Sequence, residues 1–196
     1  MTFPKLAVTL AMAAALPLGG CMTMGDEGSM ASMQSAQTVT VGGAPMYASR
    51  NIIENAVNSA DHTTLVAAVK AAGLVDTLSG PGPFTVFAPT NAAFAALPAG
   101  TVDMLLKPEN KAMLQTVLTY HVVPGRVTAA DLMQQIRAGG GSARLTTVQG
   151  GTLTARMQGS NIVLVDAKGG TATVTQADVM QSNGVIHVTN AVSLPG

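Results

Sequence analysis

The segment FTVFAPTNAAF, residues 84–94, most constrains the fold of this chain, because it joins two kinds of structure without a loop. Its first four residues are aromatic or β-branched, which favours a buried strand. Its Ala-rich end favours a helix. Between them, Pro89 biases the residue before it toward an extended conformation, and Thr90 or Asn91 can cap the helix by accepting a hydrogen bond from its first N–H groups. The segment therefore predicts a rigid strand-to-helix corner.

Hydrophobic periodicity differs between the two halves of the chain. Apolar residues recur at helical spacing in residues 52–57, 65–72, 102–106 and 113–118. After residue 150 the apolar residues instead alternate or form short β-branched runs, and Gly150-Gly151 joins two such runs as a hairpin turn would. Helices crowd the first half and strands the second, which indicates an α+β fold rather than alternating βαβ units.

The N-terminal residues 1–20 have the pattern of a secretory signal peptide. Lys5 supplies one positive charge, an apolar run begins at Leu6, and small residues precede Cys21. The apolar run is shorter than the roughly 20 residues of a membrane-spanning helix. The chain is therefore expected to be exported.

Cys21 is the only cysteine and directly follows Leu18-Gly19-Gly20, which resembles the lipobox of bacterial lipoproteins. That resemblance implies that Cys21 is lipidated and becomes the new N-terminus, so that a lipid rather than a helix holds the protein to the bilayer. Ordinary cleavage nearby is the alternative, and it would leave a thiol without a disulfide partner in an exported protein. Met22 follows Cys21, where an aspartate would argue for the inner membrane. In a host with two membranes, the outer one is the predicted destination.

Residues 21–46 are rich in Met, Gly and Ser and are predicted to form a flexible tether, since they contain few large apolar groups to bury. Their methionines suit Cu(I), but a spacer is favoured because no His or second Cys lies nearby. A globular pattern begins at Tyr47, so residues 47–196 are predicted to form one domain. Without residues 1–20 the chain has nine basic and ten acidic residues, and it contains no basic block that would bind nucleic acid.

Three separated segments resemble, in order, the sequence elements of the fasciclin-like domain. They are TVFAPTNAAF at residues 85–94, YHVVPG at residues 120–125 and GVIHVTNAVSLP at residues 184–195. The resemblance implies a β-wedge or sandwich packed against an N-terminal helical bundle, and an extracellular interaction or adhesion module without catalysis. Asn190 stands where the family commonly has aspartate, which loses a charge although an amide can keep a hydrogen bond.

The resemblance also marks candidate interaction residues. In animal relatives, two places have been linked to cell-surface receptors, and they match Tyr120-His121 and Asp178-Val179 here. The structural alternatives are that His121 is a buried histidine bonded to the corner at Thr90 or Asn91, and that Asp178 is a turn residue.

The remaining histidines are expected to be structural. His187 alternates with its neighbours along a strand and is expected to be partly exposed, whereas His62 is expected at a helix start. None of the histidines pairs with another ligand at metal-binding spacing, so no metal site is predicted.

No cofactor or catalytic motif is found in the sequence, since it lacks a nucleophile elbow and a phosphate-binding loop. A hydrolase whose triad assembles only on folding remains an alternative. The expected partners are the bilayer, through acylated Cys21, and an envelope or matrix component, protein or polysaccharide. Aromatic residues make up only 3% of the chain, which disfavours stacking on sugars. A second alternative is a carrier or sensor of an apolar small molecule, held between helices and wedge.

Overall fold

The structure is a computed structural model that describes residues 38–196. The predicted signal peptide, Cys21 and residues 21–37 of the predicted tether lie outside the described residues. No helix within the described part is long and apolar enough to cross a membrane.

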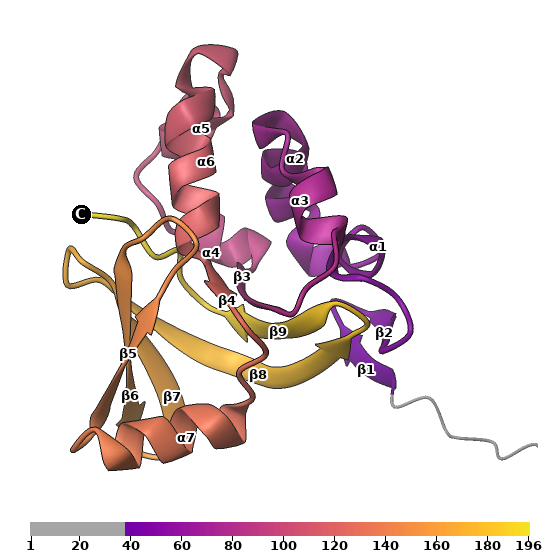
Figure 1. Ribbon diagram of the computed structural model, residues 1–196. Coiled ribbons are helices and arrows are strands. Elements are labelled where there is room, and N and C mark those ends of the chain that lie inside the picture. Colours follow the sequence, from indigo (N-terminus) through magenta and orange to yellow (C-terminus); the bar gives the residue numbers. More distant parts are fainter. Residues whose placement is uncertain (1–37) are drawn as a thin grey trace, which may run out of the picture. The chain divides into compact units, whose positions relative to one another are not determined.

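Helices occupy mainly the first half of the described chain, as the periodicity predicted (Figure 1). They are α1 (Ile52–Ala56), α2 (Thr63–Ala72), α3 (Val75–Ser79), α4 (Asn91–Ala95), α5 (Thr101–Leu106), α6 (Lys111–Tyr120) and α7 (Ala129–Ala138), with the 3-10 turns η1 (Ala60–His62) and η2 (Pro108–Asn110).

Strands occupy both ends of the described chain and most of its second half. They are β1 (Thr38–Val41), β2 (Ala44–Tyr47), β3 (Phe84–Pro89), β4 (Val122–Pro124), β5 (Ser142–Thr146), β6 (Thr152–Gln158), β7 (Asn161–Val165), β8 (Thr171–Gln181) and β9 (Gly184–Thr189). The mixture of helices and a seven-stranded sheet confirms the predicted α+β class.

The seven-stranded sheet has the order β4-β3-β9-β8-β7-β6-β5. Neighbouring strands in it are antiparallel, except that β3 and β9 run parallel, with Phe87 opposite His187. These two strands are covered on both faces, and all of β9 is buried. Parallel strands covered on both faces are typically continuous apolar runs. This explains why β3 and β9, which lie in the first and third fasciclin-like segments, are so apolar.

Strands β1 and β2 form a separate hairpin within the region that the sequence analysis placed in the tether. Val39 pairs with Met46, and Gly42-Gly43 make the turn with positive φ angles of 58° and 75°. Residues 38–46 therefore have regular structure. A scarcity of large apolar groups indicates flexibility in this region, whereas a Gly-Gly pair between short strands favours a tight hairpin turn.

Two hydrophobic cores lie on opposite sides of β3 and β9. The helix-side core contains Val41, Met46, Ile52, Leu65, Ala68, Val69, Ala72, Leu78, Val86, Ala88, Phe94, Leu105, Leu114, Val117, Leu118, Val122, Val179, Ile186 and Val188. The sheet-side core contains Phe87, Tyr120, Val123, Leu132, Ile136, Ala143, Leu145, Leu153, Ala155, Ile162, Leu164, Ala172 and Val174. In Figure 1, α1 to α6 stand on one side of β9, and α7 lies across β5 to β7 on the other. Strand β3 contributes alternate residues to the two cores, as strand geometry requires.

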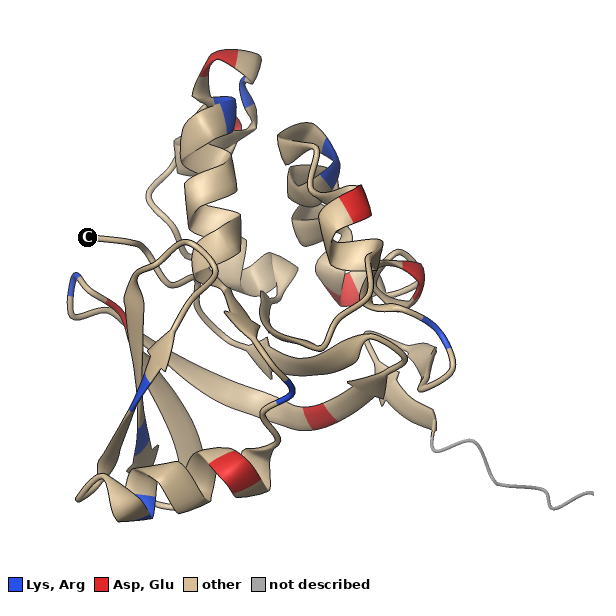
Figure 2. Cartoon of the chain, in the orientation of Figure 1, with Lys and Arg blue, Asp and Glu red and all other residues tan. Residues whose placement is uncertain are grey.

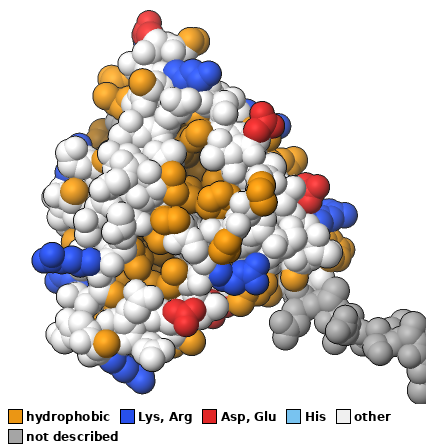
Figure 3. Space-filling view, in the orientation of Figure 1, with side chains coloured by type: hydrophobic (Ala, Val, Ile, Leu, Met, Phe, Trp, Pro, Cys, Tyr) orange, Lys and Arg blue, Asp and Glu red, His pale blue; other side chains and the backbone are white. Residues whose placement is uncertain are grey.

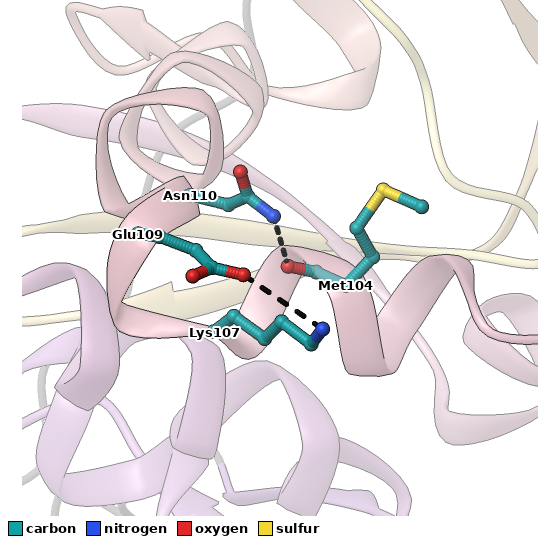
Figure 4. A network of polar contacts seen from close by, with 4 residues as sticks. All are labelled: Met104, Lys107, Glu109 and Asn110. Carbon is teal, nitrogen blue, oxygen red and sulfur yellow. Dashed lines mark hydrogen bonds and ion pairs between the residues drawn. The ribbon is translucent and has the colours of Figure 1, made fainter.

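Charged residues are few and scattered over helices, strands and loops (Figure 2). Lys107 Nζ lies 3.7 Å from Glu109 Oε1, and this is the one ion pair found among residues 38–196. Beside it, the Asn110 side chain donates a 2.7 Å hydrogen bond to the Met104 carbonyl at the end of α5 (Figure 4). Because both charged side chains are largely exposed, this pair contributes little to stability. The fold is therefore held by apolar burial and hydrogen bonds.

Candidate functional site

The strand-to-helix corner connects three elements. Thr90 is the N-cap of α4, and its side chain accepts a 3.3 Å hydrogen bond from the Ala93 N–H. Asn91 instead bridges to the start of α2, where its Oδ1 accepts from the Thr64 N–H at 3.0 Å and its Nδ2 donates to the Ala60 carbonyl at 2.7 Å. Thr90 therefore caps α4, whereas Asn91 links this corner to the start of α2.

Tyr120 is a buried member of the sheet-side core, only 1% exposed. Its hydroxyl donates to the Thr152 carbonyl at 2.7 Å and accepts from the Ala167 N–H at 3.1 Å. Burial raises the pKa of this phenol. A Cβ at Gly151 would lie 2.8 Å from the ring, which explains why glycine follows Gly150 at the hairpin turn. Tyr120 thus links α6 to the start of β6 and to the loop between β7 and β8.

His121 follows Tyr120 and is buried as well, but its ring is not hydrogen-bonded to Thr90 or Asn91. Its Nδ1 donates to the Val117 carbonyl at 2.8 Å, and its Nε2 accepts from the Ser193 N–H at 3.0 Å. The predicted partner was wrong, because Ser193 comes from the C-terminal segment, 72 residues away in sequence. Both nitrogens are used, which fixes one neutral tautomer, and burial lowers the pKa of the ring.

Asp178 and Val179 lie where β8 is irregular in its pairing with β9. Asp178 has a positive φ of 58°, and its Oδ1 accepts a 2.7 Å hydrogen bond from the Ala129 N–H at the first turn of α7. A carboxylate at a helix N-terminus is electrostatically favourable. Val179 is buried in the helix-side core. Asp178 is therefore the one member of the four candidate interaction residues that is not buried.

His187 is fully buried, so the expectation that it is partly exposed was wrong. Its Nε2 donates to the Val127 carbonyl at 2.9 Å, and its Nδ1 accepts from the Asp178 N–H at 3.3 Å. Its ring stacks on Phe87 at 5.5 Å between centroids. Burial lowers the pKa of this imidazole too. His187 and strand β3 connect the segment that contains Tyr120-His121 to the segment that contains Asp178-Val179. No hydrogen bond links the two residue pairs directly.

Asn190 keeps a hydrogen bond at the position where the family commonly has aspartate. Its Oδ1 accepts from the Thr173 N–H at 2.8 Å, and its own N–H donates to the Thr173 carbonyl at 3.1 Å. The Asn190 side chain therefore supports the pairing with Thr173 of β8 without carrying a charge.

His62 is the functional candidate that the sequence analysis missed. It stands at the N-terminus of α2, as expected, but its side chain makes no capping bond and turns into the interior. Its Nδ1 lies 2.9 Å from Ser59 Oγ, whereas its Nε2 has no hydrogen-bond partner among the described residues. Burial lowers the pKa of the ring and outweighs the opposing effects of the Ala88 backbone and the Asp61 charge. Only the fold could reveal this, because the surrounding side chains come from distant segments.

Two small cavities adjoin this region. One, of about 20 Å³, is lined by His62 and by apolar side chains only. The other, of about 30 Å³, lies between α2, α3, α6 and the sheet, where Figure 3 shows hydrophobic side chains gathered in a hollow. Over residues 38–196, no three His, Cys, Asp or Glu side chains come together as a metal site would require.

The fold and these side chains define an α+β domain whose buried polar groups mainly brace its own strands. A family model described as the fasciclin domain matches residues 60–195, and the chain belongs to the fasciclin family. This confirms the family predicted from the sequence.

Relatives agree with this assignment. Protein sll1483 from Synechocystis is 48% identical over 167 residues, which cover 85% of this chain and 86% of the relative. The cell surface glycolipoprotein MPB83 of Mycobacterium bovis is 54% identical over 59 residues, or 30% of this chain and 26% of the relative. A FAS1 domain pair from the insect cell adhesion molecule fasciclin I has the same fold, with a TM-score of 0.66 and 17% identity over 73% of this chain and 50% of that one.

Proposed function

We propose that this chain is an exported, lipid-anchored fasciclin-domain protein that binds a component of the cell envelope or surrounding matrix and is not an enzyme. The observation that carries the proposal is that the buried polar side chains of the candidate region are bonded to the domain itself. His121 and His187 each use both ring nitrogens. Neither has a nitrogen with which to take a proton from a substrate, which supports binding over hydrolysis.

The proposed anchor is an acyl group on Cys21. Two points support it: the lipobox-like sequence before Cys21, and the similarity to MPB83, which is a cell surface glycolipoprotein. Cys21 precedes β1 by 17 residues. A chain of that length reaches at most about 60 Å when fully extended, so the domain would act close to the bilayer. In a host with two membranes we place it at the outer one.

The proposed contact surface is centred on Asp178. Tyr120, His121 and Val179 are buried, so in this proposal they support the surface while Asp178 and the first turn of α7 meet the partner. The partner is a protein or polysaccharide of the envelope or matrix.

The anchor is tested by mass spectrometry on the protein purified gently from its own host, native and then denatured. We expect an acyl mass on Cys21 and partition into detergent. The Cys21→Ser variant should lose both while its domain stays folded. An unmodified Cys21 in protein that partitions into the aqueous phase would contradict the anchor.

The contact surface is tested by envelope-binding assays with Asp178→Asn. This change keeps an acceptor for the Ala129 N–H and removes the charge, so we expect weaker binding by a domain of nearly unchanged stability. Glu54→Gln, on the exposed surface of α1, is the matched charge-removing control. Equal binding by both variants and the parent would remove Asp178 from the surface.

A second candidate function is carriage or sensing of an apolar small molecule. The two apolar cavities beside α1 and α2 favour it. A stoichiometric small molecule released from the host protein on denaturation would support this function, and native masses without such a molecule would count against it.

A further inference from the structure

Charge is distributed unevenly along the described chain. Residues 38–131, which contain most of the helices, have five basic and six acidic residues. Residues 132–165, which contain β5, β6 and β7, have three arginines and no acidic residue. In Figure 2, β5 and β6 accordingly carry blue segments and no red one. The sheet-rich part of the molecule is therefore the electropositive part.

The strand register brings two of these arginines together. Arg144 of β5 pairs with Thr154 of β6, whereas Arg156 of β6 pairs with Ser142 of β5 and Val163 of β7. Paired residues share a face of the sheet, and so do residues two positions apart on one strand. Arg144 and Arg156 are therefore diagonal neighbours on one face, at positions about 7–8 Å apart. Both side chains are exposed.

No carboxylate balances these two charges. The one ion pair found among residues 38–196 lies at η2, so neither guanidinium has a carboxylate partner in the described part of the chain. Asp166 follows β7 but is only 9% exposed. Its oxygens accept hydrogen bonds from the backbone N–H groups of Lys168, Gly170 and Leu194. The positive charge of Arg144 and Arg156 is therefore available to an anionic partner.

The rest of this face, which we call the arginine face, is polar and hollowed. Its neighbouring positions include Thr154, Thr171 and Thr173, whose hydroxyl groups can donate and accept hydrogen bonds. A hollow of about 420 Å³ lies on it, bordered by Arg156, Val163, Val165 and Thr171 among others. The opposite face of the same strands belongs to the sheet-side core under α7. The arginine face is thus the solvated side of an antiparallel sheet.

This combination fits a polymer that carries both carboxylates and hydroxyls. A guanidinium binds a carboxylate through two parallel hydrogen bonds, and two neighbouring arginines can each take one carboxylate of successive units. The threonine hydroxyls suit sugar hydroxyls, and the valines offer an apolar surface to the C–H groups of a sugar ring. Strands β5 to β8 contain no aromatic residue. Charge therefore has to replace the stacking that a neutral sugar would need.

A lipid bilayer fits this face less well. Proteins that lie on a bilayer insert apolar side chains between the headgroups. The large apolar side chains that are most exposed are Val57, Met104, Met113 and Val148, and none of them belongs to a strand. A hollow also suits a chain that can enter it better than a flat surface.

We propose that the arginine face binds an acidic polysaccharide, a polymer of sugar units that carry carboxylate groups. This inference rests on the binding function proposed above, because it names the chemical class of a partner and gives it a second surface. Arg144 and Arg156 bind the carboxylates, and the hollow beside Arg156 receives a sugar ring. The surface at Asp178 does not suit the same polymer, since its own carboxylate repels an anion.

The test is calorimetric titration of the protein purified from its host with two oligosaccharides of equal length, an oligogalacturonate and a neutral maltooligosaccharide. The oligogalacturonate should bind saturably, and more weakly at high salt because the charges are exposed and screened. The maltooligosaccharide should not bind measurably. Equal binding of the two sugars, or no binding of the acidic one, would overturn the inference.

Substitution of the two arginines locates the site. The double variant Arg144→Gln, Arg156→Gln should bind the oligogalacturonate about tenfold more weakly, the value of two exposed ion pairs. Arg144→Lys with Arg156→Lys keeps the charge and loses the paired hydrogen bonds, so a smaller loss is expected. Lys70→Gln with Lys111→Gln removes the same charge from the exposed surface of α2 and α6 and should leave binding unchanged. Thermal unfolding checks that each variant is folded.

Three outcomes with these variants would contradict the proposal. Equal losses in the arginine variant and the lysine control would show an effect of net charge alone. Tighter binding to phosphatidylglycerol vesicles than to the oligogalacturonate, lost with the two arginines, would assign the face to the bilayer. If Asp178→Asn weakens envelope binding and the arginine variant does not, the proposed function stands and this inference fails.

Discussion

The helix-side and sheet-side cores are built from similar residues, but they differ in how completely they are filled. The sheet-side core lies between hairpin-connected strands and α7, and its polar members Tyr120 and the adjacent His187 have their hydrogen bonds satisfied. Both small cavities and the unpartnered nitrogen of His62 belong mainly to the helix-side core. Pairing register fixes where strand side chains meet, whereas several helices here have only five or six residues and pack with more freedom. The helix-side core, which packs less regularly, is therefore where this fold has room for a ligand.

The largest loss of stability should come from removing a large side chain from the sheet-side core, which is the better filled of the two. Tyr120→Ala removes a buried ring and should lower the free energy of unfolding by about 3–5 kcal/mol. Leu65→Ala should cost less, about 2–3 kcal/mol, because the leucine side chain is smaller and already borders both cavities. Urea unfolding of both variants measures this. If Leu65→Ala costs as much as Tyr120→Ala, the two cores are equally well packed.

The residues of the two cores also show what could and could not be predicted from the sequence. The corner from β3 to α4, the α+β class and the family follow from local patterns between residues 84 and 94 and from the two later segments. The burial of His187, the bond from Ser193 to His121 and the cavity at His62 depend on residues tens of positions apart. Alternation along β9 predicted two faces correctly but could not show that both are covered. The same limit applies to the hairpin at residues 38–47, whose short strands are stabilised by docking on α1 and β8.

Replacing a buried alanine by a larger residue tests the same difference between the two cores, by filling space instead of emptying it. Ala155→Val adds methyl groups to a fully buried position between paired strands, and overpacking there should cost about 1–3 kcal/mol. Ala56→Val adds the same groups beside the cavities and should cost less than about 1 kcal/mol, much of it helix propensity. Thermal unfolding measures both, and Ala112→Val gives the propensity cost alone. A larger loss for Ala56→Val than for Ala155→Val would reverse the comparison.

Acid should destabilise both cores through their histidines. The pKa values of His62, His121 and His187 are lowered in the folded state, chiefly by burial. Below the unfolded pKa of 6.5 the unfolded chain therefore takes up protons that the folded chain does not. Stability is complete above pH 6.5 and falls as the pH drops toward each folded pKa, by about 1.4 kcal/mol per pH unit for each histidine.

The measurement is urea unfolding at pH values between 7.5 and 5. The His62→Phe variant should lose about one histidine's share of this slope, with Lys70→Gln, an exposed change on α2, as the control. A slope that His62→Phe leaves intact would show that His62 is already protonated when folded or never titrates in this range.

The smallest effect should come from the exposed ion pair, which belongs to neither core. Glu109→Gln removes the partner of Lys107 at the η2 turn and should change stability by less than about 0.5 kcal/mol. Thermal unfolding in low and high salt should give nearly the same result for the parent. A strong dependence on salt would mean that charge contributes more to this fold than the described residues indicate.

The hairpin has a mechanical consequence. Thr38 pairs with Tyr47 at the open end of β1 and β2, so a pull on the chain that precedes residue 38 loads that pair first. The remaining pairs then open one after another, as in a zipper, whereas the bonds of the long central strand β8 share a load between two neighbouring strands. Tension should therefore peel β1 away at low force and leave the seven-stranded sheet intact. Because Val41 is the last residue of β1 and lines the cavity at His62, the same pull would uncover that cavity.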